Sequence, residues 1–309
     1  MTTVLGCAAL GGLYRPVTVE DAHAALGTAW DLGIRRFDTA PHYGVGQSEE
    51  YLGRFLCDKP RESYSLSTKV GRLLVDDPGA IDGTDGFFGA PARSRLRDYS
   101  ADGVRRSLQD SLGRLGLDRV DLALVHDPED HMPQAIEEAA PALAKLRDEG
   151  TIAGFGVGTN LTEIAERFVR DTASDTVMIA GRYSLLDRRA EHSLLPLCQE
   201  RGVRVQVAGV LNSGLLADPK VGAPFNYHPA PDWILGAARR MAAACQEHGV
   251  SLRAAALQFP IRHAAVTTVV VGPGSEATVR DTVAQMNVTI PDDLWDHLDS
   301  LVPDQNRLP

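Results

Sequence analysis

Eight short apolar runs, most of them followed by a longer stretch with helical spacing, constrain this chain more than any other feature. The runs are TVLGCAAL, RRFDTA, YSLSTKV, VDLALVH, AGFGVGT, TVMIAG, VRVQVAG and VTTVVVG. Such alternation favours parallel strands joined by right-handed helical crossovers. The unbroken apolar character of VDLALV and TTVVV is typical of strands buried on both faces. We therefore expect an α/β fold, a (β/α)8 TIM barrel that forms one domain over residues 1–309.

The connecting stretches carry the start and stop signals of helices. Thr18, with Asp21 three residues later, resembles a capping box at the start of the first helix, and Gly33 stands where a helix-ending glycine belongs. The segment IPDDLWDHLDSLV, from Ile290, predicts one extra helix near the C-terminus. Three long loops are expected after strands, at residues 71–99, 127–132 and 212–231, and in a barrel they lie on the face that carries the site. Aromatic residues that could form pocket walls are Tyr14, Phe87, Phe88, Tyr227 and Trp233.

The net charge limits the kinds of partner that we expect, and the spacing of the cysteines indicates a cell compartment. The chain has 31 Lys and Arg against 41 Asp and Glu, a net charge of −10, which argues against nucleic acid or an anionic membrane as the main partner. Its four cysteines are far apart and form no CxxC pair, as expected for reduced thiols in a cytoplasmic protein without a zinc site. No apolar run approaches the roughly 20 residues of a membrane span. A monomer and a homo-oligomer both remain open.

Four polar residues stand at or just after the ends of three successive predicted strands. Asp38 ends the second strand, Tyr43 follows in its loop, Lys69 ends the third strand and His126 ends the fourth. In a barrel all four would point at one rim. A nearby ammonium favours tyrosinate and lowers the pKa of a tyrosine, which is ordinarily about 10. We expect Tyr43 to exchange a proton with a carbonyl or hydroxyl oxygen, with Lys69 and Asp38 tuning it and His126 binding the same oxygen.

These residues carry a family resemblance. DTA-xx-YG, the strand-end lysine and LVHDP resemble the signature of the aldo-keto reductases, from LGGLY near the start to the GPGS loop near the end. The resemblance implies a barrel that binds NAD or NADP and converts a carbonyl to an alcohol or the reverse. It also implies a set of cofactor-binding residues: Asn160, Tyr183, Asn212, Ser213, Leu215, Gly272, Gly274, Ser275 and Arg280. GPGSEA itself fits GxGxxA only weakly, and a phosphate site after the last barrel strand explains it better than a Rossmann unit.

Three positions differ from the common pattern of the family. Ala180 replaces a glutamine, Gly209 replaces the aromatic residue that stacks on the nicotinamide, and Gly274 replaces a cation for the 2′-phosphate of NADP. The last difference favours NAD, although Arg280 is a possible substitute cation. AGRYSLLD, LNSGLL and AALQFP resemble the sugar-dehydrogenase branch, with its L-fucose and D-threo-aldose 1-dehydrogenases and pyridoxal 4-dehydrogenase. The expected reaction is oxidation of an aldose at C1 to a lactone.

Three alternatives stay open at this point. An NADPH-dependent reductase of aldehydes or ketones would use the same four residues in the opposite direction. A barrel that binds nucleotide for regulation would do little chemistry. A metal-dependent hydrolase would use His126, Asp127 and His131, but the sequence offers no second cluster of ligands, and no GxSxG motif supports a serine hydrolase.

Overall fold

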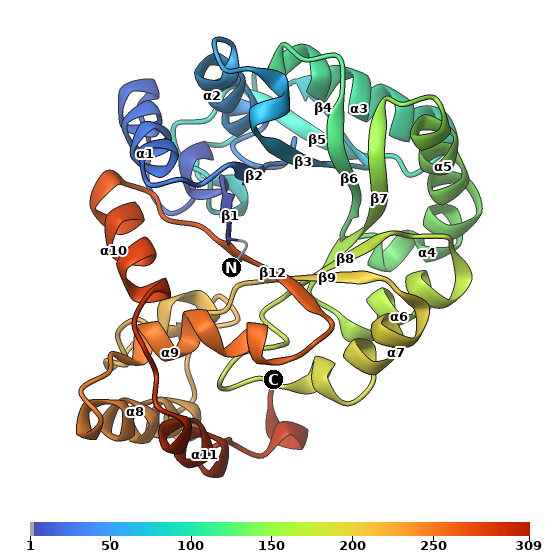
Figure 1. Cartoon of the computed structure of the whole chain (residues 1–309). Helices are drawn as coiled ribbons and strands as arrows, with labels where there is room; N and C mark the ends of the chain where they lie inside the picture. The colour runs from blue at the N-terminus through green and yellow to red at the C-terminus, as the bar shows by residue number, and fades with distance from the viewer. Residues whose placement is uncertain (1–2) are drawn as a thin grey trace.

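Eight parallel strands close into a barrel in this protein, so the predicted fold class is confirmed (Figure 1). The computed structural model describes residues 3–309. The barrel strands are β1 (Thr3–Gly6), β2 (Arg36–Asp38), β3 (Ser65–Val70), β6 (Val120–His126), β7 (Ile152–Thr159), β8 (Thr176–Ala180), β9 (Arg204–Ala208) and β12 (Val266–Val271). They lie side by side in this order, and β12 pairs with β1 to close the ring. Each overlaps one of the eight runs from which a strand was expected.

Helices surround the barrel and connect its strands (Figure 1). They are α1 (Val19–Asp31), α2 (Gln47–Leu56), α3 (Ala101–Leu115), α4 (Met132–Gln134), α5 (Ala140–Asp148), α6 (Thr162–Asp171), α7 (Leu194–Arg201), α8 (Asp232–Glu247), α9 (Leu252–Gln258), α10 (Glu276–Met286) and α11 (Asp292–Ser300). Thr18 caps α1 by accepting a hydrogen bond from the Asp21 N–H at 3.1 Å. Gly33 follows α1 with a φ of 87°. Helix α11 is the expected extra C-terminal helix.

Strand register decides which side chains point into the barrel. Asp38 lies beside Ser67, Lys69 beside Leu124, and His126 beside Gly158. Side chains alternate between the two faces of a strand, so Asp38, Lys69 and His126 point the same way as Leu124. Leu124 belongs to a small buried cluster inside the barrel, with Val4, Leu122, Met178 and Val270. The polar end of the barrel interior therefore begins directly above this apolar plug.

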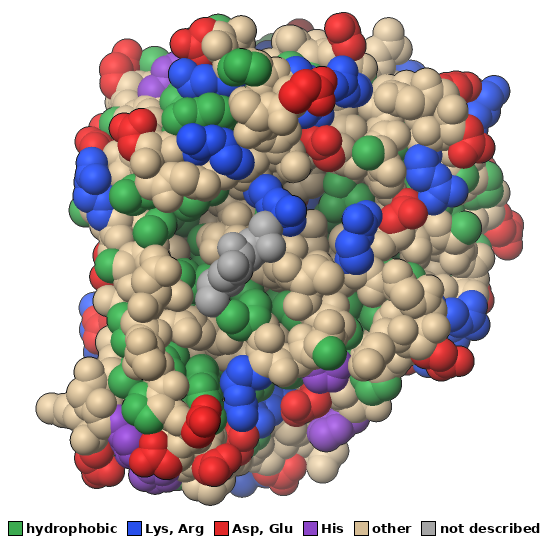
Figure 2. Space-filling view, in the orientation of Figure 1, with side chains coloured by type: hydrophobic (Ala, Val, Ile, Leu, Met, Phe, Trp, Pro, Cys, Tyr) green, Lys and Arg blue, Asp and Glu red, His purple; other side chains and the backbone are tan. Residues whose placement is uncertain are grey.

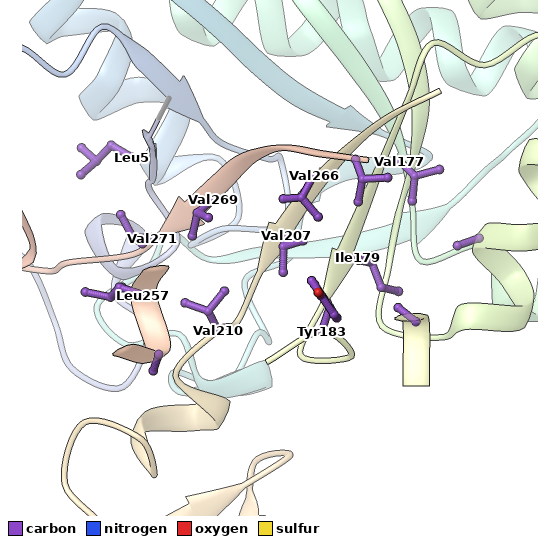
Figure 3. Packing of buried hydrophobic residues seen from close by; sticks show 14 of the residues in the cluster. Leu5, Val177, Ile179, Tyr183, Val207, Val210, Leu257, Val266, Val269 and Val271 are labelled. Atoms are coloured by element: carbon purple, nitrogen blue, oxygen red, sulfur yellow. The ribbon is translucent and has the colours of Figure 1, made fainter. Parts of the chain in front are cut away.

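The opposite faces of the same strands form the main hydrophobic core. Val177 and Ile179 of β8, Val207 of β9, and Val269 and Val271 of β12 are all buried in it (Figure 3). These residues pack together with helical side chains such as Leu257 of α9. Burial on both faces explains why the strands read as continuous apolar runs.

Two of the expected loops contain short strands of their own. The segment 71–99 folds into an antiparallel pair, β4 (Arg72–Asp76) and β5 (Arg93–Arg97), and Phe87 between them bridges to Leu13. The segment 212–231 contains a smaller pair, β10 (Pro224–Phe225) and β11 (His228–Pro229). Strand β5 contains three arginines and is partly exposed, and β4 has only three consecutive apolar residues, Leu73–Val75, so neither was expected as a strand. This hairpin is what the sequence reading missed in the loop after β3.

The face shown in Figure 2 carries Lys and Arg as well as Asp and Glu side chains around its edge. None of the helices within residues 3–309 is both long enough and apolar enough to cross a membrane. Cys7, Cys57, Cys198 and Cys245 are all free thiols.

Candidate active site

A fully buried lysine is the centre of the site. Lys69 is 1% exposed, and its ammonium donates to Asp38 Oδ2 at 2.7 Å, to Tyr43 Oη at 3.0 Å and to the Thr39 carbonyl at 3.0 Å. These three bonds use all three N–H donors of the ammonium. Ser67 donates to the other oxygen of Asp38 at 2.7 Å, so the carboxylate is held from both sides. The structure thus brings Asp38, Tyr43 and Lys69 into one hydrogen-bonded unit.

The loop after β2 places Tyr43 over this unit by a close backbone approach. Gly44 has a φ of 59°, and a Cβ atom on it would lie 2.2 Å from the Gly11 carbonyl oxygen. Only glycine fits there, and this is the physical reason for the YG pair in the sequence. The contact ties the loop after β2 to the segment after β1 and fixes the phenol next to Lys69.

The pKa of Tyr43 is raised in the structure, whereas the sequence led us to expect that Lys69 would lower it. Burial raises the pKa of Tyr43 to about 12, although the Lys69 ammonium lowers it and Asp38 raises it further. Burial lowers the pKa of Lys69, but Asp38 and Tyr43 raise it by more. The pKa of Lys69 is therefore above its usual value. Lys69 is therefore positively charged at neutral pH. Its charge limits the rise in the Tyr43 pKa but does not reverse it. At neutral pH Tyr43 is a phenol that can donate its proton.

His126 completes the group of four. Its ring lies edge-on to the Tyr43 ring at 5.9 Å between centroids. Burial, together with the charges of Arg72 and Lys69, lowers the pKa of His126 well below its usual range, so the ring is neutral. A neutral imidazole carries one N–H, and beside Tyr43 it can supply a second hydrogen bond to the oxygen that exchanges a proton. The four residues can move a proton at one substrate oxygen, while any hydride must come from another molecule.

A cavity of about 550 Å³ opens above these residues. Asp38, Tyr43, Lys69 and His126 all line it, and so do His42, Asp85, Phe87, Asp127 and Tyr227. Phe87 and Tyr227 are two of the aromatic residues considered as pocket walls. Phe87 reaches the cavity from the loop between β4 and β5, and it stacks on Tyr43 at 6.1 Å between ring centroids.

A second cleft, of about 360 Å³, joins this cavity. Asn160, Ala180, Gly209, Tyr227, Val270 and Gly272 line both. Among the residues expected to bind a cofactor, Asn160, Asn212, Ser213, Gly272 and Gly274 line the cleft. Asn212 is 2% exposed, and its Nδ2 atom is buried with no partner among residues 3–309. An unpaired buried donor at the wall of a cleft fits a ligand that carries hydrogen-bond acceptors.

The other four residues expected to bind a cofactor make contacts within the protein. Tyr183 is 2% exposed and packs against Phe259 with 5.0 Å between ring centroids, and Leu215 is fully buried. Ser275 accepts a hydrogen bond from the Thr278 N–H as the N-cap of α10. Arg280 is largely exposed and lies 3.9 Å from Glu276. None of these four residues lines the cleft.

Sequence reasoning missed several residues that do line it. They are Arg182, Arg253, Thr278 and Thr282. Arg182 lies in the AGRY segment, between Ala180 and Tyr183, which were both considered from the sequence. Nothing in the local sequence marks Arg253, at the start of α9, as a cleft residue. Gly209 has a φ of 65°, and a Cβ atom there would lie 3.0 Å from the Gly181 nitrogen. This crowding explains why the position that often carries an aromatic residue has none here.

The suggested metal ligands do not form a site. Residues 3–309 contain no group of three His, Cys, Asp or Glu side chains placed to hold a metal ion. His131 instead packs against Tyr99, with 5.2 Å between ring centroids.

Comparison with known proteins agrees with this geometry. D-threo-aldose 1-dehydrogenase of Pseudomonas sp is 42% identical over 301 residues, which cover 95% of this chain and 91% of that protein. Pyridoxal 4-dehydrogenase of Microbacterium luteolum is 41% identical over 316 residues, covering 96% of this chain and 92% of that protein.

Solved structures agree as well. An aldo-keto reductase from Bacillus halodurans, solved in its holo form, superimposes with a TM-score of 0.77 at 25% identity and covers 99% of this chain and 95% of its own. The model of the aldo/keto reductase family matches residues 3–303. With its closed barrel and its unit of Asp38, Tyr43, Lys69 and His126, this chain belongs to the aldo/keto reductase family.

Proposed function

We propose that this protein oxidises an aldose at C1 to the corresponding lactone, with NAD as the preferred cofactor. Aldo-keto reductases are NAD(P)-dependent oxidoreductases that act on small carbonyl or sugar substrates. The observation that carries the proposal is the polar cavity next to Tyr43, in which His42, Asp85 and Asp127 offer hydrogen bonds that a sugar can use and a simple aldehyde cannot. The name of the D-threo-aldose 1-dehydrogenase relative supports the same substrate class.

In this reaction Tyr43, in its phenolate form, takes the proton of the anomeric hydroxyl on its Oη atom. The C1–O1 bond becomes a carbonyl as a hydride leaves C1, and the nicotinamide of the cofactor supplies the hydride acceptor. Lys69 stabilises the phenolate form of Tyr43 through the bond between Nζ and Oη. His126 holds O1 in place. The apolar plug below the site, formed around Leu124 and Met178, seals the barrel beneath the reacting atoms.

The cleft beside the cavity suits a dinucleotide. Asn160 and Gly209 stand where the cleft and the cavity meet and would hold the nicotinamide end. Asn212, with its unpaired Nδ2 atom, would bind the pyrophosphate, together with the Gly272–Gly274 segment that precedes α10. Thr278 and Thr282 of α10 would lie along the adenosine end.

The preference for NAD rests on the charges at that end. Gly274 has no side chain, and Arg280 points to Glu276. Two arginines line the cleft: Arg182 donates to Asn226 at 2.8 Å, and Arg253, which lies beside Thr282 of α10, is already bound by Asp281 at 2.8 Å. Because the charge of Arg253 is already paired with Asp281, this arginine attracts a 2′-phosphate less, and this disfavours NADP. Dissociation constants for NAD⁺ and NADP⁺ test this, and Asp281→Asn should tighten NADP⁺ binding while leaving NAD⁺ binding nearly unchanged.

The activity is tested by the absorbance of the reduced nicotinamide. Purified protein is supplied with NAD⁺ or NADP⁺ and with L-fucose, D-arabinose, L-galactose or pyridoxal. Turnover of an aldose is expected, and Tyr43→Phe should abolish it. Tyr64→Phe, at the opposite end of β3, is the matched control and should retain activity. An enzyme that ignores every aldose and reduces simple aldehydes with NADPH would refute the proposal.

A second candidate function is the reduction of an aldehyde or ketone. One observation favours it: burial raises the pKa of Tyr43 to about 12, and a phenol that holds its proton is ready to donate it to a carbonyl oxygen. Methylglyoxal and lactaldehyde with NADH or NADPH test this direction in the same assay.

A further inference from the structure

The buried arginine Arg72 connects two polar residues of the substrate cavity, His42 and Asp127, and Asp127 Oδ2 also lies 3.5 Å from His126 Nε2. Its Nη1 atom lies 2.9 Å from His42 Nδ1, and its Nη2 atom donates to Asp127 Oδ2 at 2.6 Å. Arg72 is 8% exposed, so these two contacts lie inside the protein. Both His42 and Asp127 line the cavity above Tyr43.

Arg72 fixes the tautomer of His42. A guanidinium has only N–H donors, so His42 Nδ1 must be the acceptor of that bond. Burial and the charge of Arg72 lower the pKa of His42 to about 2, and the ring is therefore neutral at any working pH. The single ring proton then sits on Nε2, which has no protein partner among residues 3–309. His42 thus brings an N–H donor to the cavity.

Asp127 brings the complementary acceptor. Its Oδ2 atom is taken by Arg72, while Oδ1 has no hydrogen bond among the described residues. The backbone of Asp127 is held in a left-handed conformation with a φ of 45°, and its carbonyl lies 2.9 Å from the Tyr99 hydroxyl. A non-glycine residue in this conformation is strained and persists only when its surroundings fix it. The side chain is 34% exposed, so the carboxylate is accessible from the cavity.

The hairpin strand β4 makes this arrangement possible. Gly71 turns the chain between β3 and β4 with a φ of 96°, and a Cβ atom on it would lie 2.3 Å from the Tyr99 ring. Arg72 follows directly and is the first residue of β4. The carbonyl of His42 in turn accepts from Arg95 Nη2 of β5 at 3.0 Å. The same hairpin therefore positions both the side chain and the backbone of His42.

The position of the pair relates it to the reacting carbon. The His42 ring lies 6.2 Å from the Tyr43 ring and 5.6 Å from the His126 ring, centroid to centroid. Tyr43 and His126 mark the place of the oxygen that exchanges a proton. The His42 ring lies next to both of these rings, and Asp127 Oδ2 lies 3.5 Å from His126 Nε2, so both residues can reach a substituent on the carbon next to the reacting one.

We propose that His42 and Asp127, both held by Arg72, form a donor and acceptor pair that binds the hydroxyl group next to the reacting carbon. The pair makes the enzyme select substrates with a hydroxyl at that carbon, which are aldoses and 2-hydroxyaldehydes, over deoxy or unsubstituted ones. His42 and Asp127 are specificity residues, and Arg72 is a positioning residue that acts through them. This inference rests on the proposed carbonyl and alcohol chemistry of Tyr43 but extends to either direction of the reaction.

The test compares an aldose with its 2-deoxy analogue. For the wild-type enzyme we expect kcat/KM to favour the aldose by about 10-fold to 100-fold, the range of one or two hydrogen bonds that involve a charged group. Asp127→Asn and His42→Phe should each lower kcat/KM for the aldose far more than for its 2-deoxy analogue, so that most of this preference is lost. Arg72→Lys keeps the charge but makes one bond instead of two, and it should raise KM for the aldose far more than it lowers kcat. Arg97→Gln, on the same hairpin with a half-exposed side chain, is the matched control.

A failure of the proposed function is separable from a failure of this inference. If no sugar is oxidised, the same ratio is measured in reduction with lactaldehyde and propionaldehyde. Sugar binding to Tyr43→Phe protein, followed by calorimetry, gives a readout that needs no turnover at all. The inference would be overturned if the wild-type enzyme had the same kcat/KM for hydroxylated and deoxy compounds. It would also be overturned if Asp127→Asn and His42→Phe lowered kcat/KM equally for both kinds of compound.

Discussion

Replacing Lys69 with methionine tests the reasoning about Tyr43 most directly. The Lys69 ammonium lies 3.0 Å from Tyr43 Oη. At an effective dielectric constant of about 20, a phenolate at that distance gains at most about 5 kcal/mol from the ammonium. Part of this gain is offset in the wild-type protein, because the nearby Asp38 raises the pKa of Tyr43. A net loss of about 3 to 4 kcal/mol corresponds to about 100-fold to 1,000-fold in rate.

The direction of the pH dependence follows from the same pKa. Oxidation needs Tyr43 as a phenolate, and burial raises its pKa to about 12. The kcat/KM for oxidation should therefore rise with pH, by about tenfold per pH unit below that value, while kcat/KM for reduction stays flat until the phenol ionises. In Lys69→Met the rise of kcat/KM for oxidation should occur at higher pH. At pH 8, kcat/KM for oxidation should fall by about 100-fold to 1,000-fold.

The assay is a pH profile of kcat/KM in both directions, with ionisation of tyrosine followed by ultraviolet difference absorbance. Lys59→Met is the control, because Lys59 pairs with Asp58 at the protein surface. A Lys69→Met enzyme that keeps the wild-type profile would refute the view that Lys69 stabilises the phenolate.

Three further predictions concern other parts of the molecule. Burial raises the pKa of Asp127 to about 6, so its acceptor carboxylate is lost as pH falls through that value, and KM for an aldose should rise below pH 6 in the wild type but not in Asp127→Asn. Glu49 is fully buried and accepts from Arg114 at 2.7 Å, so Glu49→Gln should lower the free energy of unfolding by about 3 kcal/mol in urea titrations. A Cβ atom on Gly156 would lie 1.6 Å from the Thr176 carbonyl oxygen, so Gly156→Ala should separate β7 from β8 and yield little folded protein by circular dichroism.

Matched controls separate these effects from general damage. Arg119→Gln breaks an exposed pair with Glu62 and should change the free energy of unfolding by less than about 0.5 kcal/mol. Gly154→Ala meets only the movable carboxylate of Asp175, at 3.3 Å, and should fold. If Glu49→Gln proves as stable as Arg119→Gln, or if Gly156→Ala folds as well as Gly154→Ala, the packing argument at that position is wrong. A sugar KM that is flat across pH 6 would count against Asp127 as an acceptor.

The loops show where reading the sequence reached its limit. The segment 71–99 was expected to be a long loop, yet it forms β4 and β5, and the arginine-rich β5 is partly exposed and has no apolar pattern. Tyr183 and Arg280 were expected at the cofactor, but one is packed in the core and the other points to Glu276. Arg253 was not singled out, although it lines the cleft. The hairpin, Tyr183 and Arg253 are each placed by contacts between residues far apart in the chain, whereas Arg280 pairs with Glu276 four residues away in the same helix.

What the sequence alone determined was the barrel and the four residues at its rim. Eight apolar runs imply eight buried parallel strands, because each run records local burial on both faces. Polar residues at the ends of three such strands must meet, because parallel strands end at the same edge. The tertiary structure decided the rest. It set the sign of the Tyr43 pKa change, since burial outweighs the effect of Lys69. It also placed Arg72 between His42 and Asp127, 30 and 55 residues away in sequence, because a hairpin with no local signal folds over the cavity.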